Sequence, residues 1–590
     1  MATVVNPPRD PNTLSNYNNW VSTHITANFD ILFDQRKLAG NVIHQFRSTT
    51  HGESNQIILD TNHLDIGSVK VNGQPSEWEY LPRLEPYGTP LKIKLDQGVK
   101  LNDTIEVDIS VKTTEKCTAL QWLTPAQTSN KKHPYMYTPD VKCTLDFNIT
   151  SPLPVIASGL PVRGSSEAPK SDGKTLYKFH QKVPIPSYLF ALASGVVATS
   201  PDKLSECQWE LEADTEKFIN AIEKIVYPYV WGEYNVLILP PSFPYGGMEN
   251  PIFTFATPSI ISKDRENIDV IAHELAHSWS GNLVTNASWE HFWLNEGWTT
   301  YLERRIVAAV HGEPYRHFSA IIGWKALTDS VEHFGPEHDF TKLITNLKGM
   351  DPDDAFSSIP YEKGFNFLFH LENLVGKSKF NLFIPHYFNK YKGKSLDSYE
   401  FKSTILDFFK DDSEASTVLN ELDWDRWFYA PGLPPKPDFD TSLVDVVYDL
   451  AKKWLSLPNS SFKPQPEDIR DLTANQVVVF LEQILVSERQ LTPELSKLMG
   501  EIYGLAASQN IEVANLYFQV GLQAGDASVL EPTADLLGKI GRMKFVRPLY
   551  RKLAKFDRKR AIETFEKHRD FYHPICRAMV EKDLFGKKDE

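Results

Sequence analysis

The chain has 590 residues, of which 41% are apolar and 12% aromatic, so it is long enough for several folded domains and is not a disordered chain. Its formal net charge of −14 and the absence of long Lys/Arg runs exclude a general phosphate-binding surface, so we expect no nucleic-acid partner. No apolar run approaches the length of a membrane span, and the first residues do not resemble a signal peptide, so we expect a cytoplasmic protein with no membrane partner.

The first part of the chain, residues 1–187, is predicted to be a β domain. In Thr104–Val111 apolar and polar residues alternate, and Gln56–Asp60 is a second run of strand-forming residues. Asn72-Gly73 and Pro86-Tyr87-Gly88 are typical of tight turns. Together these patterns predict a mostly antiparallel sheet or sandwich.

Residues 188–429 combine short strands with longer helical patterns. Asn235–Leu239 is a strand candidate, whereas the stretch around residues 268–279 has the apolar spacing of a helix. The residues expected to form its buried stripe are Ile268, Ile271, Ala272, Leu275, Ala276 and Trp279. We therefore predict a second domain of mixed α and β structure here, and its helix carries the residues of greatest chemical interest.

Residues 430–440 are predicted to be a linker, because Ala430–Pro437 contains four prolines in eight positions and cannot continue a helix or a central strand. Helical spacing dominates residues 441–590, with Thr473 and Gln476 as a possible capping box. The apolar face expected for one helix consists of Leu495, Leu498, Met499, Ile502 and Leu505. The fold class predicted is therefore multidomain α+β, with a C-terminal all-α domain of stacked helices.

His273-Glu-Leu-Ala-His277 places two imidazoles four residues apart, so on a helix both rings project from one face and can bind one ion. Glu274 lies about 100° around the helix from His273, where it can reach a water on that ion without being a ligand. The same residues could occur by chance on a solvated helix face. The surrounding residues are apolar, however, and without partners the buried imidazoles would be costly, so we favour a metal site.

Glu296 is the candidate third ligand, nineteen residues after His277, near the expected start of another helix. On its own, a carboxylate there is equally well explained as a favourable charge at a helix N-terminus. A catalytic zinc site has three protein ligands and one open position, and the upstream His pair supplies the other two. We therefore predict one Zn²⁺ per chain, bound by His273, His277 and Glu296.

These motifs resemble a known family. His273-Glu-x-x-His277 followed by Glu296, and preceded by Gly246-Gly-Met-Glu-Asn250, is similar to the gluzincin zinc aminopeptidases. Tyr361-Glu-Lys-Gly364 and Gly541-Arg-Met-Lys-Phe545 resemble the leukotriene A(4) hydrolase branch, of a fungal or other non-animal type. The resemblance covers nearly the whole chain and implies a thermolysin-like zinc domain between the β domain and the helical domain.

The resemblance implies roles for further residues. Glu249, within the segment that also contains Gly246, Gly247 and Met248, would bind the free α-amino group of a peptide, which an internal peptide bond does not offer. Tyr361 would donate a hydrogen bond to the oxyanion, and Glu274 would take the proton of the attacking water and pass it to the leaving amine. Without the resemblance, Gly246-Gly247 would be assigned to a turn and Tyr361 to the core or surface.

Three more residues are assigned by the resemblance alone. Arg542 and Lys544 match residues that bind the C-terminal carboxylate of a substrate, which implies that short peptides, and di- and tripeptides in particular, are favoured. Asp353 matches an acid that favours a basic first residue and takes part in epoxide hydrolysis. Otherwise two cations would indicate a solvated face, and Asp351–Asp354 a loop.

The sequence departs from the family pattern in two places. Members carry about twenty residues with a Gln-x-Gln element after a Lys-Lys-His-Pro-Tyr segment, whereas here Lys131–Tyr137 leads directly into Thr138. A skipped exon or a wrong gene model would explain this, and a true deletion would remove a strand and part of the substrate site. Phe356 stands where animal leukotriene A(4) hydrolases have a tyrosine, so we expect epoxide hydrolysis to be weak.

Two other functions remain open at this point. An epoxide hydrolase acting on leukotriene A(4)-type lipids would need a long apolar pocket next to the metal. A catalytically impaired peptide-binding protein would follow if the segment between Tyr137 and Thr138 is truly absent, although the intact Glu274, Glu249 and Tyr361 argue against it. We expect a monomer, and the sequence leaves the nucleus open as a second location.

Overall fold

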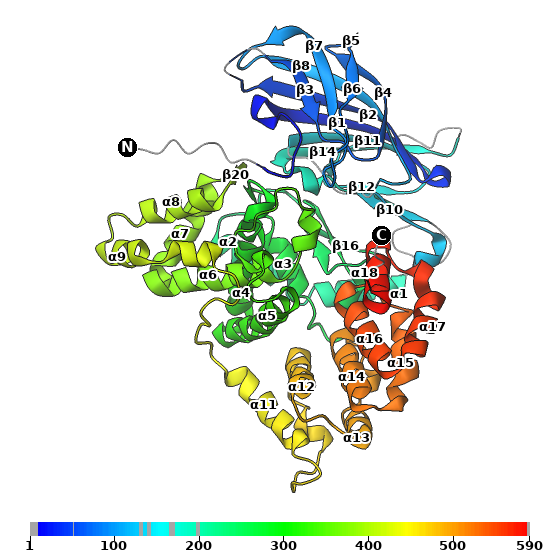
Figure 1. The fold of residues 1–590 in the computed structure, drawn as a ribbon, viewed down its shortest axis with the longest axis vertical. Coiled ribbons are helices and arrows are strands. Elements are labelled where there is room, and N and C mark those ends of the chain that lie inside the picture. Colours follow the sequence, from blue (N-terminus) through cyan, green and yellow to red (C-terminus); the bar gives the residue numbers. More distant parts are fainter. Residues whose placement is uncertain are drawn as a thin grey trace.

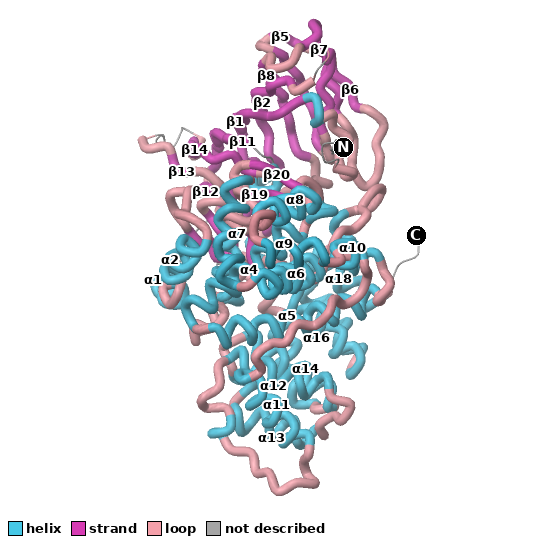
Figure 2. Tube along the Cα trace, turned by 90° about the vertical axis from the view of Figure 1, so that its left-hand side faces the viewer, coloured by secondary structure: helices cyan, strands magenta, loops and turns pink. Residues whose placement is uncertain are grey.

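The computed structural model describes residues 10–50, 52, 54–117, 119–128, 134–138, 143–164, 172–195 and 201–586. A β domain, blue to cyan in Figure 1, lies at one end of the molecule, and a green central domain and a yellow-to-red helical domain lie below it. Figure 2 shows most strands gathered at that end and helices through the remainder. The predicted multidomain α+β fold is confirmed.

The first domain is made of strands with short connections. Its strands are β1 (Trp20–Leu32), β2 (Lys37–Ser48), β3 (Ser54–Leu59), β4 (Leu64–Val71), β5 (Gln74–Pro75), β6 (Trp78–Tyr80), β7 (Leu91–Val99), β8 (Thr104–Thr113), β9 (Gln121–Leu123), β10 (Tyr135–Thr138), β11 (Cys143–Ser151), β12 (Val155–Ala157), β13 (Leu160–Pro161), β14 (Thr175–Ile185) and β15 (Leu192–Ser194). The largest sheet has the order β13-β14-β11-β1-β2-β8-β4-β5, and its pairs are antiparallel except for β1 with β11.

The local patterns explain this sheet. Along β8 Ile105, Val107 and Ile109 are buried at every second residue, as the alternation predicts, and Thr113 is buried at the end of the strand. The β4–β5 turn has positive φ at Asn72 (49°) and Gly73 (78°), the conformation that Asn-Gly favours in a two-residue hairpin.

Strand β10 crosses the point where the sequence departs from the family. It pairs with β9 and β15, and it runs through the Tyr137–Thr138 peptide bond without a break in the strand. Residues 129–133 and 139–142, on either side, lie outside the described part of the chain.

The central domain consists mainly of helices around a small sheet. Its elements are α1 (Pro201–Leu211), α2 (Thr215–Ile225), β16 (Asn235–Ile238), β17 (Gly247–Met248), β18 (Phe253–Ala256), α3 (Asp269–Ala276), β19 (Val284–Asn286), α4 (Trp293–His311), α5 (Glu313–Phe334), α6 (Ile359–Val375), α7 (Lys377–Lys390), β20 (Lys394–Leu396), α8 (Ser398–Phe408), α9 (Ser413–Glu421) and α10 (Trp424–Tyr429). All six residues of the predicted apolar stripe are buried. The helix itself is shorter than predicted, because the chain turns away after His277, its C-cap, toward Gly281 with φ 103°.

The helical domain follows a segment without helix or strand, residues 430–441. Its helices are α11 (Ser442–Leu455), α12 (Ala474–Val486), α13 (Pro493–Tyr503), α14 (Ile511–Ala524), α15 (Leu530–Leu537), α16 (Met543–Phe556), α17 (Arg558–His568) and α18 (Pro574–Phe585). The capping box of Thr473 and Gln476 is confirmed at the start of α12. No helix in the described ranges combines the length and apolar character needed to cross a membrane.

The predicted apolar face of α13 is wrong in detail. Leu498 is 37% exposed, whereas Ser496, Met499, Gly500 and Tyr503 are buried. A Cβ atom on Gly500 would overlap the hydroxyl of Tyr517 on α14, so the two helices pack too closely for large side chains. Met499 and Leu505 of the predicted face are buried, but Ser496 and Gly500, which the apolar pattern does not mark, lie in the contact in place of Leu498.

The helical domain is joined to the central domain close to β17. Met543 N donates a hydrogen bond to Pro244 O at 2.9 Å, and a Cβ atom on Gly541 would lie 2.6 Å from Ser242 Cα. Asn510 and Asn267 exchange side-chain hydrogen bonds at 3.0 and 3.2 Å. The start of α16 is therefore held directly beside the segment 242–249.

Candidate active site

The two histidines of α3 direct the same ring nitrogen at one carboxylate oxygen. His273 Nε2 and His277 Nε2 lie 3.5 and 3.3 Å from Glu296 Oε2, which α4 supplies from its first turn. His277 Nδ1 donates to Ser280 O at 2.9 Å, and His273 Nδ1 lies 2.8 Å from Glu303 Oε2. Because these oxygens are acceptors, each neutral imidazole has its hydrogen on Nδ1 and its lone pair on Nε2, facing Glu296.

These three residues fit a metal ion. Their ligand atoms lie within 4.8 Å of one another. Glu296 Oε2 is buried and has no hydrogen-bond partner among the described residues, which is costly unless a cation compensates it. Two imidazoles and a carboxylate facing a cavity form the donor set of a catalytic zinc site.

The charges of the buried carboxylates at this site also favour a positive charge between them. Burial favours the neutral form of Glu296, but the imidazoles of His277 and His273 outweigh it and lower the pKa of this carboxyl to about 2. Burial opposes protonation of His277, but Glu249 and Glu296 raise the pKa of its imidazole to about 9. The carboxylates thus favour positive charge at this position, and a metal ion supplies it.

Glu274, on the same helix, lies against strand β17. A Cβ atom on Gly247 would lie 2.5 Å from Glu274 Cδ, so only glycine leaves room for this carboxylate. Burial raises the pKa of Glu274 to about 7, with His273 and His277 acting in the opposite direction. A carboxyl group that titrates near neutral pH can both accept and donate a proton.

Glu249 is a further carboxylate at the same place. It is buried, and its Oε1 lies 4.0 Å from His277 Nδ1. Asn282 Nδ2 donates to the Glu249 carbonyl at 2.9 Å and fixes the backbone there. Within the described ranges no lysine or arginine forms an ion pair with Glu249, so its side chain is available to a cationic group from outside.

Tyr361 reaches the site from the first turn of α6. Its ring centroid lies 5.9 Å from that of His273 and 6.2 Å from that of Phe292. Burial, followed by the charges of Glu296, Glu249 and Glu274, raises the pKa of Tyr361 well above its usual range. The phenol therefore stays protonated and able to donate.

Two motif glycines set the distance between Glu296 and Tyr361. A Cβ atom on Gly364 would lie 2.7 Å from Gly297 Cα, and one on Gly297 would lie 2.7 Å from Gly364 Cα. Helices α4 and α6 therefore touch through their backbones one residue after Glu296 and three residues after Tyr361. Larger residues at either position would separate the metal ligand from the tyrosine.

Arg542 and Lys544 come from the helical domain, at the start of α16. Arg542 Nη1 donates to Ser259 Oγ at 3.2 Å and lies 3.6 Å from Glu512 Oε1. Lys544 Nζ donates to the same Glu512 oxygen at 2.8 Å. Because the single carboxylate of Glu512 contacts two cations, Arg542 and Lys544, the group keeps a net positive charge that can bind an anionic group of a ligand.

Asp353 and Phe356 lie at the rim, in and just after a 3₁₀ turn, η8 (Pro352–Ala355). Phe356 is 54% exposed, and its ring centroid lies 6.2 Å from that of Tyr361 and 6.4 Å from that of Tyr245. Burial raises the pKa of Tyr245 to about 12, and the charge of Asp353 adds to this effect. The predicted loop is therefore one wall of the site.

All twelve residues predicted for the site line one cavity of about 1020 Å³. One part of its wall is polar and contains the metal ligands, Glu249 and Glu274. The lining also includes apolar residues, among them Trp289, Phe292, Leu343, Leu347 and Ala355. The structure brings the predicted residues together, while their individual roles stay predictions.

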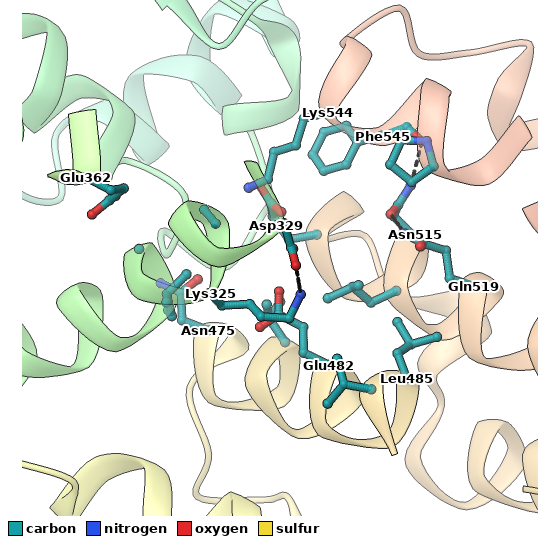
Figure 3. Close-up of a pocket in the computed structure, with 18 of the residues that line it drawn as sticks. Lys325, Asp329, Glu362, Asn475, Glu482, Leu485, Asn515, Gln519, Lys544 and Phe545 are labelled. Carbon is teal, nitrogen blue, oxygen red and sulfur yellow. Dashed lines mark hydrogen bonds and ion pairs between the residues drawn. The ribbon is translucent and has the colours of Figure 1, made fainter. Parts of the chain in front are cut away.

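A second cavity of about 1110 Å³ lies between the central and helical domains and shares Asp269, Glu303 and Lys544 with the first. Figure 3 shows its polar walls, with Lys325 Nζ 2.6 Å from Asp329 Oδ1 on α5 and Asn515 Nδ2 donating to Phe545 O at 3.3 Å. The two cavities therefore meet beside the candidate metal site.

Glu303 was not predicted from the sequence. It follows Glu296 by seven residues on α4, so two helical turns place both carboxylates on one face, and Glu303 reaches His273 Nδ1. That spacing was a usable signal.

Comparison with known proteins identifies the family of this chain. Residues 15–189 match the peptidase M1 N-terminal domain, residues 209–427 the peptidase family M1 domain, and residues 472–584 the leukotriene A4 hydrolase C-terminal domain. Leucine aminopeptidase 2 of Neosartorya fischeri is 94% identical, with 100% of both chains covered. The chain belongs to peptidase family M1. Its metal is Zn²⁺, in agreement with the donor set.

Other M1 relatives and solved structures agree. Leucine aminopeptidase 2 of Aspergillus fumigatus is 91% identical, and the match covers 100% of both chains. Leucine aminopeptidase 2 of Coccidioides immitis is 66% identical, and the match covers 100% of this chain and 99% of that relative. Yeast LTA4 hydrolase in complex with bestatin has a TM-score of 0.92 and 43% identity, with 98% of both chains covered. An M1 zinc metallopeptidase of Deinococcus radiodurans, 19% identical with a TM-score of 0.55, shares the fold over 71% of this M1 chain and 96% of its own.

The comparison with Neosartorya fischeri also bears on the missing segment. The alignment runs over 617 positions, 27 more than the 590 residues of this M1 chain, so at least 27 positions stand opposite gaps in it. A shortened chain, as the sequence predicts, therefore agrees with this alignment, although its length does not place the gap.

Proposed function

We propose that this M1 protein is a zinc aminopeptidase that releases single residues from the amino termini of short peptides. The observation that carries the proposal is that the buried carboxylate of Glu249, beside the metal ligands, forms no ion pair with a lysine or arginine of the described residues. We assign Glu296 to metal binding and Glu274 to base catalysis. A third carboxylate here is suited to bind the ammonium group of a peptide that begins at the site.

The side chains present can perform the reaction in sequence. Glu249 binds the α-ammonium group and thereby places the first peptide bond beside His273 and His277. When bound, zinc supplies Lewis acidity toward the scissile carbonyl and lowers the pKa of water. Glu274 takes a proton from the attacking water and gives it to the leaving amine, and Tyr361 donates a hydrogen bond to the developing oxyanion.

Substrate preference is part of the proposal. Arg542 and Lys544 offer a binding site for a C-terminal carboxylate, which favours di- and tripeptides because both ends are bound. The name of the relatives, leucine aminopeptidase 2, supports an apolar first residue. Asp353 at the rim supports additional acceptance of a basic first residue.

The test is hydrolysis of leucyl, alanyl and arginyl chromogenic amides by the purified protein. We expect release that a chelator stops and added zinc restores, and no release from N-acetyl-leucyl amide, which lacks the ammonium group. Glu274→Gln should lower kcat by roughly 10²- to 10⁴-fold while the zinc content stays unchanged. A folded, zinc-loaded protein that hydrolyses none of these amides would refute the aminopeptidase and support a peptide-binding role.

Weak epoxide hydrolysis is a second candidate, favoured by the apolar wall of Trp289, Phe292, Leu343, Leu347 and Ala355. Such a wall suits the hydrocarbon part of a leukotriene A(4)-type lipid epoxide, and yeast LTA4 hydrolase is among the similar structures. Phe356 offers no hydroxyl next to Tyr361, which supports only slow turnover. Slow diol formation that Glu296→Gln abolishes would support this activity, and equal rates in both proteins would refute it.

A further inference from the structure

Lys363 is a buried charge that the proposed reaction does not use. The residue is 2% exposed, and within the described ranges no carboxylate forms an ion pair with it. Burial lowers the pKa of the ammonium group to about 8, so it remains charged at neutral pH. A buried charge without an opposite charge is expensive, and a chain retains one only where other contacts hold it.

Three backbone carbonyls hold this ammonium group. Lys363 Nζ donates to Thr341 O at 2.8 Å, to Ala430 O at 2.8 Å and to Gly432 O at 2.9 Å. Thr341 ends a 3₁₀ turn, η7 (Asp339–Thr341), and residues 430–432 begin the segment that leads to the helical domain. Gly432 N donates to Thr341 Oγ1 at 2.8 Å, so the three segments meet at one junction.

The junction lies next to the catalytic end of α6. Lys363 follows Tyr361 by two residues, and Glu362 between them accepts two hydrogen bonds from Arg304 of α4, both at 2.8 Å. The first turn of α6 is therefore held on one side by Glu362 and on the other by Lys363. Directly after Thr341 the chain continues as the cavity wall, with Lys342 and Leu343.

We propose that Lys363 is a positioning residue, which fixes the hydroxyl of Tyr361 by joining the first turn of α6 to η7 and to the start of the linker. The proposal rests on the proposed function of Tyr361 as oxyanion donor. A hydroxyl displaced by about 1 Å stabilises the oxyanion poorly while ground-state binding by Glu249 and Arg542 continues. Loss of the junction therefore lowers kcat and leaves KM nearly unchanged.

A double-mutant cycle with Tyr361 tests this. We expect Lys363→Met to lower kcat by roughly 10- to 100-fold with unchanged zinc content, and Lys363→Arg to recover most of the loss. In the Tyr361→Phe background, Lys363→Met should change kcat little, because the hydroxyl that it positions is already absent. If the two losses multiply, Lys363 acts independently of Tyr361 and the proposal is overturned.

Two further variants keep the test decisive if Lys363→Met folds poorly. Thr341→Val removes the acceptor of Gly432 N without removing a charge, and it should lower kcat in the same Tyr361-dependent way, by a smaller factor. Lys436 is an exposed lysine of the same linker, and its ammonium group lies over the ring of Trp324 on α5. Lys436→Met should leave kcat unchanged. A Thr341→Val effect that persists in Tyr361→Phe would contradict the proposal.

A readout without turnover separates this proposal from the proposed function. In protein labelled with 3-fluorotyrosine, the ¹⁹F resonance that disappears in Tyr361→Phe belongs to Tyr361. It should shift in Lys363→Met and Thr341→Val and stay in place in Lys436→Met, whether or not peptides are hydrolysed. A resonance that does not move would overturn the positioning role, and an inactive wild type would overturn only the aminopeptidase.

Discussion

At the residue scale, position 247 must be glycine because the carboxylate of Glu274 occupies the space of a side chain there. The spacing of His273 and His277 predicts the ligands because a helix converts sequence distance into direction, but no such rule predicts which residue must be small. In the folded protein a Cβ atom on Gly247 would lie 2.5 Å from Glu274 Cδ. The proposed general base, Glu274, is thus positioned partly by the absence of a side chain on Gly247.

We expect Gly247→Ala to lower kcat by roughly 100-fold, because the methyl group displaces Glu274 from the attacking water. The zinc content should stay near one ion per chain, since the change touches no ligand. Kinetics on a leucyl amide together with metal analysis measure both. Gly52→Ala, where a Cβ atom meets nothing within 4 Å, is the control, and equal effects in the two variants would contradict this account.

At the scale of elements, the contact of α4 with α6 brings together the proposed metal ligand Glu296 and the proposed oxyanion donor Tyr361. Each of these residues lies in the first turn of its helix and is followed by a glycine at the crossing. The pair Arg304–Glu362 then joins the helices by two hydrogen bonds of 2.8 Å. The distance between Glu296 and Tyr361 is therefore set by this helix crossing.

We expect Gly364→Ala to reduce the free energy of unfolding by roughly 1–3 kcal/mol, because the added methyl group meets Gly297 Cα and forces the helices apart. It should also lower kcat, since Tyr361 moves away from Glu296. Urea unfolding and peptide kinetics provide the two measurements. Ser403→Ala, an exposed position on α8, should change neither quantity, and a Gly364→Ala protein with wild-type stability would refute the tight crossing.

At the scale of the whole molecule, the helical domain completes a site that the central domain begins. Figure 1 shows the two domains side by side, and Gly541 makes their contact close enough for Arg542 to reach Ser259. Arg542 follows Glu296, the last of the predicted zinc ligands, by 246 residues of chain, and only docking places the two in one cavity.

Gly541→Val should displace Arg542 by pushing against the backbone of Ser242. We expect KM for a tripeptide to rise by roughly tenfold, as the loss of one charged hydrogen bond would predict, and KM for a leucyl amide, which has no carboxylate, to stay unchanged. Arg542→Ala should show the same pattern. Equal changes for both substrates would mean that Arg542 does not bind the carboxylate.

Stability should depend on pH in part through two buried histidines in different domains. Burial lowers the pKa of both His291 and His573 from 6.5 to about 4. The unfolded chain therefore binds protons below pH 6.5 that the folded chain does not, so the free energy of unfolding is full above pH 6.5 and falls as the pH drops toward 4.

Each histidine contributes at most about 3 kcal/mol to this loss. Urea unfolding at several pH values between 7.5 and 4.5 measures it. A variant with His291→Gln and His573→Gln should be less stable at pH 7.5 but lose less stability on acidification than the wild type. Parallel curves for the two proteins would contradict the assignment.

Much of the site was predictable because its chemistry is local in sequence. The approach of His273 and His277 to one point follows from helical spacing, and the alternating residues of β8 and the capping box of α12 follow from equally short patterns. Family motifs supplied Glu249, Tyr361, Arg542 and Lys544, whose individual settings are unremarkable. Glu303 was missed although its spacing from Glu296 was a usable signal.

The sequence by itself determined the elements and the identity of the chemical groups, because hydrophobic period, capping and ligand spacing act over a few residues. Only the tertiary structure decided what depends on close approach between distant segments. The glycine crossing of α4 and α6, the small-residue face of α13 and the carbonyl junction around Lys363 are examples. Each arises where packing leaves no room for a side chain or brings distant backbone groups to one charge, and neither condition leaves a pattern in the linear chain.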